Sequence, residues 1–159
     1  MNTQIHLLSQ LRECYKEEGW FKPLQTVLKD ISEEEIDFKM DENTHSIRQL
    51  INHLIFWNGR WLSRFKGNEP GEFEEANEIT FEDSSKNQTG KELINRLNES
   101  FEEWDKELEM CSEEKLDSIL FEGTDYRGSW SVFISSMILH SVYHLGQIMQ
   151  IKKHFLKQE

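Results

Sequence analysis

The stretch SVFISSMILHSVYHLGQIMQIKKHF, residues 131–155, decides the fold that the sequence predicts. Its apolar residues recur at the period of an α-helix, and His140 and His144 lie four residues apart within it. Residues at this spacing lie on one face of a helix with roughly 6 Å of rise between them, so two imidazole nitrogens can converge on one ion. The spacing alone also fits two histidines placed by chance, because short motifs have many false matches.

The segment 131–155 is apolar on two sides. The histidine side also carries Phe133, Met137, Gln147, Ile151 and Phe155, and the roughly opposite side carries Ile134, Ile138, Val142, Leu145 and Met149. Because both faces need cover, we expect one to pack inside a bundle and the other to join two copies in a homodimer. The alternative is that other helices of the same chain wrap around the second face.

Length and charge exclude several classes of protein. The chain has 159 residues, the size of one domain, and we predict a single domain over 1–159. Its formal net charge of −12 argues against a nucleic-acid partner, because non-specific nucleic-acid affinity comes mainly from clustered lysine and arginine. The start MNTQIHLLSQLREC lacks a secretory pattern, and polar residues interrupt the apolar part of 131–151. We expect a cytoplasmic protein with no membrane span.

Three further long segments keep a helical period. They run over 3–16, 46–67 and 89–108, and the last two begin with the capping boxes Ser46-Ile47-Arg48-Gln49 and Thr89-Gly90-Lys91-Glu92. With 131–155 they make four main helices, and no stretch shows a convincing period of two. The sequence therefore predicts an all-α fold, a four-helix bundle of the up-down type with a long crossover loop.

Shorter segments connect these helices. We expect a kinked helical segment over 23–31, a capped turn at Ser32, a short helix over 112–120, and a turn or small hairpin in FEGTDYRGSW, 121–130. The connection 68–88 is rich in glutamate and lacks a period. Such a charge run is usually a solvated loop, although a long loop beside a site can also act as a lid.

A third histidine, His53, lies at the edge of the apolar stripe of the segment 46–67 and can face the bundle from one side. Alone, such a residue is usually a half-buried histidine bonded to a neighbour. With His140 and His144 it offers three neutral imidazoles to one divalent ion and leaves coordination positions for water or substrate. Three protein ligands indicate a catalytic site more readily than a structural one.

Other polar and aromatic side chains allow two interpretations each. Gln147 lies close to one turn beyond His144 and is a candidate to orient a ligand histidine or a bound water, or else an ordinary buried amide. His45 is interpreted as a helix-entry residue and not as a fourth ligand. Trp57, Trp61, Trp104 and Trp130 are predicted to fill the core, unless one of them lines a substrate pocket.

Two stretches, THSIRQLINHLIFWNGRW (44–61) and HSVYHLGQI (140–148), resemble the DinB/YfiT-like superfamily of metalloenzymes. The resemblance spans nearly the whole chain. In that family a histidine of the second helix and an H-x-x-x-H pair on the fourth hold the metal, which implies His53, His140 and His144 here. Some relatives carry an acidic residue directly after the first histidine of the pair, where this chain has Ser141.

The resemblance implies frequent dimerisation and a divalent ion of the zinc or nickel type. The family includes bacillithiol S-transferases, mycothiol-dependent maleylpyruvate isomerases and bundle domains of thiol-histidine sulfoxide synthases. It therefore implies a metal that lowers the pKa of a small-molecule thiol, with bacillithiol as the candidate co-substrate and an electrophile as acceptor. The alternatives are a non-catalytic metal-binding or interaction dimer, and a metal-dependent hydrolase that uses metal-bound water.

Overall fold

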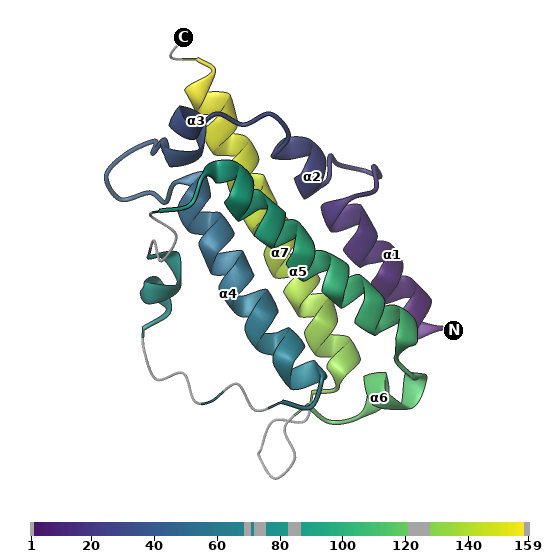
Figure 1. Ribbon diagram of the computed structural model, residues 1–159. Helices are drawn as coiled ribbons and strands as arrows, with labels where there is room; N and C mark the ends of the chain where they lie inside the picture. The colour runs from purple at the N-terminus through teal and green to yellow at the C-terminus, as the bar shows by residue number, and fades with distance from the viewer. Residues whose placement is uncertain (1, 69–70, 72–75, 83–86, 121–127, 158–159) are drawn as a thin grey trace.

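The computed structural model describes residues 2–68, 71, 76–82, 87–120 and 128–157, and these form helices and connections without a β-strand. Four long helices lie side by side as a bundle (Figure 1): α1 (Thr3–Tyr15), α4 (Ile47–Phe65), α5 (Gly90–Met110) and α7 (Trp130–Phe155). The short elements are α2 (Leu24–Val27), α3 (Glu33–Asp37), the 3-10 helix η1 (Asn77–Phe81) and α6 (Glu113–Asp117). The prediction of an all-α four-helix bundle is confirmed.

Helices α4 and α5 run in the same direction. Near the start of α4, Arg48 Nη1 donates to the carbonyl of Gln88, and near its end Lys66 pairs with Glu103 of α5. Two parallel neighbours need a connection that returns along the bundle, and in the described part of this connection η1 lies along α4 (Figure 1). The long crossover predicted from the sequence is therefore present, and it carries η1 along the side of α4.

The starts of α4 and α5 follow from their capping boxes. Ser46 Oγ accepts from the backbone N–H of Gln49, and the Gln49 side chain accepts from the backbone of Ser46. The same reciprocal pair forms between Thr89 and Glu92 at the start of α5. Because the first backbone N–H groups of a helix lack partners within it, these side chains set where each helix begins.

The connection between α1 and α4 is less helical than the sequence predicts. The segment expected over 23–31 is helical only at Leu24–Val27, and Asp30 has a φ of 57°. A left-handed residue cannot continue a right-handed helix, so the chain turns before α3. At Gly90 a Cβ would lie 3.0 Å from Ile36 Cδ1, so glycine permits α5 to begin directly against α3.

The second apolar face of α7 is covered within the chain. Ile134, Ile138 and Leu145 are 0%, 4% and 2% exposed, and α1 and α6 pack against this helix. For these three residues, helices of the same chain cover the face, which is the alternative to a dimer contact. The exposed apolar side chains of α7 are instead Val132, Leu139, Tyr143 and Met149. The homodimer itself stays a prediction.

A second polar cluster lies between α1 and α5. Asp105 is buried and accepts hydrogen bonds from Arg12 Nε (3.0 Å), Tyr15 Oη (2.8 Å) and Lys16 Nζ (2.6 Å). Tyr15 also stacks on Phe101 with ring centroids 5.3 Å apart. The carboxylate thus has three donors where α1 meets α5, and charge-assisted bonds of this kind are the stronger ones.

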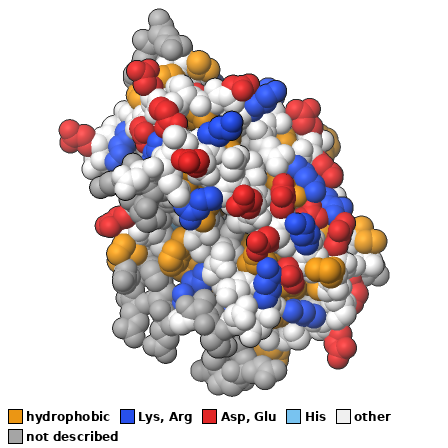
Figure 2. Space-filling view, in the orientation of Figure 1, with side chains coloured by type: hydrophobic (Ala, Val, Ile, Leu, Met, Phe, Trp, Pro, Cys, Tyr) orange, Lys and Arg blue, Asp and Glu red, His pale blue; other side chains and the backbone are white. Residues whose placement is uncertain are grey.

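Among the described residues, one helix, α7, is long and apolar enough to cross a membrane by length and composition alone. Its buried residues pack against the other helices, as they do in the core helix of a soluble bundle. In the view of Figure 2, lysine and arginine are interspersed with aspartate and glutamate over the surface. These features are consistent with a soluble protein.

Candidate metal centre

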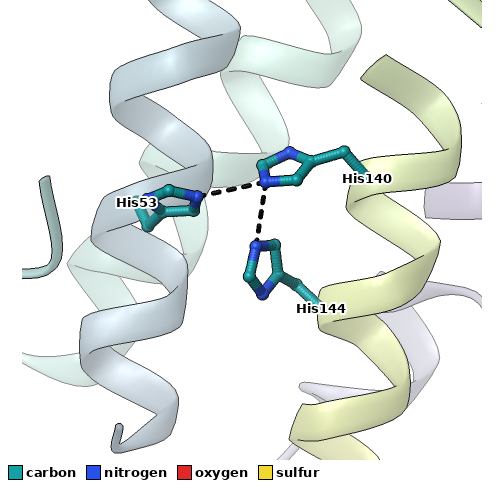
Figure 3. Close-up of side chains that lie close together, drawn as sticks. All are labelled: His53, His140 and His144. Atoms are coloured by element: carbon teal, nitrogen blue, oxygen red, sulfur yellow. Dashed lines mark hydrogen bonds between the residues drawn. The ribbon is translucent and has the colours of Figure 1, made fainter. Parts of the chain in front are cut away.

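The three predicted histidines come together between α4 and α7. His53 projects from α4, His140 and His144 project from α7, and their imidazoles face one another (Figure 3). The Nε2 atom of His140 lies 3.1 Å from His53 Nε2 and 2.9 Å from His144 Nε2. One nitrogen from each ring lies within 4.8 Å of the others. The helical spacing on α7 and the facing position of His53 on α4 therefore bring the three imidazoles together at one point.

The spacing of these nitrogens fits a divalent ion. Imidazole nitrogens bind zinc at about 2.0–2.1 Å, which places two such nitrogens about 2.9–3.4 Å apart for angles near 90–110°. The two Nε2 separations, 3.1 and 2.9 Å, agree with this range. Three histidines fill only part of a four- to six-coordinate shell, so positions remain for a further ligand.

Hydrogen bonds to the far side of two rings set their tautomers. The Thr80 hydroxyl donates to the carbonyl of Asn77, so Thr80 Oγ1 accepts from His53 Nδ1–H at 2.5 Å. Gln147 Oε1 accepts from His144 Nδ1–H at 2.6 Å, while the Gln147 amide nitrogen donates to Tyr143 Oη. With a proton on each Nδ1, the Nε2 lone pairs of both histidines point into the cluster and suit a cation.

The element η1 holds His53 from two directions. Thr80 bonds its Nδ1, and the ring of Phe81 stacks on its face with centroids 3.9 Å apart and an interplanar angle of 7°. His45 stacks on the ring of Phe81 at the same centroid distance of 3.9 Å. The stacked rings of His45, Phe81 and His53 thus fix the plane of the His53 imidazole.

Neither Thr80 nor Phe81 was found from the sequence, because both lie in the acidic connection that was interpreted as a loop or a lid. The only signal was the short apolar run Ile79-Thr80-Phe81 among acidic residues. Gln147 bonds His144, the contact that an orienting role for this glutamine requires. The remaining glutamate-rich parts of the connection, 69–70, 72–75 and 83–86, and most of the predicted hairpin, 121–127, lie outside the described residues.

Burial keeps the three imidazoles uncharged at neutral pH. Burial, together with a smaller repulsion from the neighbouring imidazoles, lowers the pKa of His53 to about 3 and the pKa of His144 to about 4. Burial also lowers the pKa of His140. Because only the neutral imidazole offers a lone pair, this environment favours metal ligation over protonation.

The histidine cluster opens on a cavity of about 280 Å³. His53 and His140 form part of its wall, and the rest includes Trp57, Trp61 and Phe133. A larger cavity of about 460 Å³ lies beyond Gln147 and is lined by none of the three histidines. A ligand that completes the coordination of an ion would therefore enter the smaller, aromatic cavity.

Comparison with known proteins gives one match. A family model described as the DinB superfamily matches residues 18–148, a range that contains all three histidines, η1 and Gln147. No curated protein and no solved structure matches the chain.

Proposed function

Because the chain belongs to the DinB superfamily, we propose that its three histidines hold a zinc or nickel ion in a metal-dependent transferase of low-molecular-weight thiols. One observation carries the proposal: three uncharged imidazoles bring their Nε2 atoms together at the wall of a cavity. A site with three protein ligands and an open side suits catalysis better than a closed structural site. The thiol class rests on the resemblance to thiol-dependent members of the family.

Different residues of the chain hold the ion and orient the histidines that bind it. His53, His140 and His144 hold the ion, while Thr80 and Gln147 keep protons on Nδ1 of His53 and His144. A bound divalent ion would supply Lewis-acid chemistry, since a thiol that coordinates a metal loses its proton far below its ordinary pKa. In the transfer, sulfur forms a bond to an electrophilic carbon, the leaving group departs with its electron pair, and the thiol proton passes to solvent.

The test is a thiol-conjugation assay on metal-loaded protein. Bacillithiol or glutathione is mixed with benzyl bromide, and thioether and benzyl alcohol are measured by mass spectrometry against the uncatalysed reaction. We expect metal-dependent formation of thioether, lost on chelation and in His144→Gln. Metal-dependent benzyl alcohol without thioether would favour the hydrolase, and bound metal without either product would favour a non-catalytic metal-binding protein.

The assembly and location of the protein are further parts of the proposal. We propose a homodimer through α7 in which the contact uses the exposed side chains of Val132, Leu139 and Tyr143. These side chains form an apolar stripe beside the site. Sedimentation that finds only a 19.0 kDa species at micromolar concentration would exclude the dimer. A cytoplasmic location and the lack of a nucleic-acid partner remain predictions from composition.

A further inference from the structure

The cavity next to the histidines has an apolar wall of unusual composition for a metal site. Besides His53 and His140, it is lined by Trp57, Trp61, Phe133 and Met137, with Asn77 and Ser136 as the other polar members. Its volume of about 280 Å³ is close to twice the roughly 150 Å³ of an apolar cavity that takes up benzene. The space therefore fits one aromatic ring with a reactive substituent.

The aromatic side chains are held in place before any ligand arrives. Trp57 Nε1 donates to Asn77 Oδ1 at 3.2 Å, which ties the indole to η1. Trp57 and Trp61 lie nearly parallel, with centroids 6.4 Å apart, and Phe133 contacts Trp61 at a centroid distance of 4.3 Å. Rings constrained in this way present flat surfaces on which a planar ligand stacks at little entropic cost.

The described side chains that line the cavity carry no formal charge. Among the described residues that line it, none is lysine, arginine, aspartate or glutamate. The Ser136 hydroxyl already donates to the carbonyl of Val132, and Asn77 Oδ1 already accepts from Trp57. Away from an ion at the histidines, a carboxylate or ammonium group that entered would lose its hydration without gaining a charged partner from these side chains, which is unfavourable.

We infer that the acceptor of the thiol is a neutral, planar apolar electrophile, and that Trp61 and Phe133 select it by stacking beside the histidines. This inference rests on the proposed thiol transfer. The electrophilic carbon would lie toward His53 and His140, and the ring would lie among the aromatic side chains. The bond changes are those of the transfer already given: a carbon–sulfur bond forms, and the leaving group departs with its electron pair.

The experiment compares three bromides with metal-loaded protein and one thiol: benzyl bromide, bromoacetamide and bromoacetate. Each rate is divided by the uncatalysed rate of the same compound, so that intrinsic reactivity cancels. We expect benzyl bromide to exceed bromoacetate by at least about tenfold, because the side chains that line the cavity stack on the ring and give the carboxylate no charged partner. Equal corrected rates for the three bromides would overturn the inference while leaving thiol transfer intact.

Variants at two positions, Trp61 and Ser136, test which side chains set the selectivity. Trp61→Ala should lower kcat/KM for benzyl bromide about tenfold, mainly through KM, and leave bromoacetamide within about twofold, since a stacking surface is lost. Trp61→Phe should keep most of the preference. Ser136→Lys, at an exposed position on the cavity wall, should raise the corrected rate for bromoacetate about threefold to tenfold, and Ser136→Gln should not. If Trp61→Ala leaves the preference for benzyl bromide over bromoacetate unchanged, Trp61 does not select the acceptor by stacking.

A binding measurement separates this inference from the proposed function. Benzyl alcohol, which transfers nothing, should quench tryptophan fluorescence of the metal-loaded protein, and acetate should not. Trp61→Ala should weaken benzyl alcohol binding about tenfold. If no bromide yields thioether but benzyl alcohol binds, the transferase proposal fails and the cavity assignment stands. If benzyl alcohol causes no saturable change, the cavity assignment fails.

Discussion

Two buried polar clusters of this bundle differ in how their hydrogen-bonding groups are paired. At the α1–α5 contact, the acceptor Asp105 meets donors from Arg12, Tyr15 and Lys16. At the α4–α7 contact, His53 and His144 direct lone pairs toward His140, whose single Nε2 can donate to only one of them. The first cluster pairs its acceptor with donors of the same chain, whereas the second brings together acceptors that suit a cation.

The comparison teaches how to tell structural polar groups from binding groups. Buried polar atoms cost free energy unless they are paired, so a cluster that pairs them all stabilises the fold. In the histidine cluster, Thr80 and Gln147 keep protons on Nδ1, so the Nε2 atoms of His53 and His144 remain acceptors. Such a cluster is completed by a partner from outside the chain, such as a cation. The difference predicts that changes at one cluster affect stability and changes at the other affect metal content.

The largest expected effect is on metal binding. His144→Ala removes one of three ligands, and we expect zinc or nickel affinity to fall by more than about 100-fold. Calorimetric titration of metal-free protein measures this, and the thermal stabilisation by added metal should disappear with it. The control is His6→Ala, an exposed position on α1. If His144→Ala binds metal with the affinity of the wild type, the histidine cluster is not the metal site and the distinction between the two clusters fails.

The next largest effect is on stability. Asp105→Ala leaves the cations of α1 without their buried partner, but Arg12 and Lys16 are 26% and 35% exposed and regain water. We therefore expect the free energy of unfolding to fall by about 2–3 kcal/mol, below the 3–5 typical of a fully buried pair. Urea denaturation measures it. Glu109→Ala, which removes an exposed partner of Arg12, should cost less than about 1 kcal/mol. Metal affinity should not change in either variant.

A smaller effect tests the residue that sequence analysis missed. Thr80→Val keeps the shape of the side chain and removes the acceptor of His53 Nδ1–H, so we expect metal affinity to fall about 10-fold to 100-fold. Thr80→Ser should stay within a few-fold of wild type because it retains the hydroxyl. If the Thr80→Val and Thr80→Ser variants bind metal equally well, the hydrogen bond from His53 to Thr80 does not orient His53.

The smallest effect is a pH dependence at the complete cluster. Burial opposes ionisation of Asp105, but hydrogen bonds from Arg12, Lys16 and Tyr15 outweigh it and hold the pKa of Asp105 below its ordinary value. This contribution to stability is present above the unfolded pKa of about 3.9 and is lost as pH falls toward the folded pKa. The stability difference between wild type and Asp105→Asn should therefore shrink between about pH 5 and pH 3. A constant difference in urea denaturation would contradict the lowered pKa.

Several elements of the fold follow from neighbouring residues alone. The capping boxes at Ser46 and Thr89 predicted where α4 and α5 begin, because a cap depends on contacts within one turn. The H-x-x-x-H spacing predicted that His140 and His144 share a face, since the helical period sets it. By contrast, the period of α7 did not reveal which apolar face lies inside, because two faces with similar composition compete for the same core.

The sequence by itself determined the four helices, the three histidines and the candidate role of Gln147, since each depends on helical spacing or on capping. Only the tertiary structure decided that η1 supplies Thr80 and Phe81 to His53, and that Trp57, Trp61 and Phe133 wall the cavity beside the cluster. These contacts join residues from different elements, some across the crossover connection and some between facing helices. No local pattern encodes them, because they form only when α4, α7 and η1 pack together.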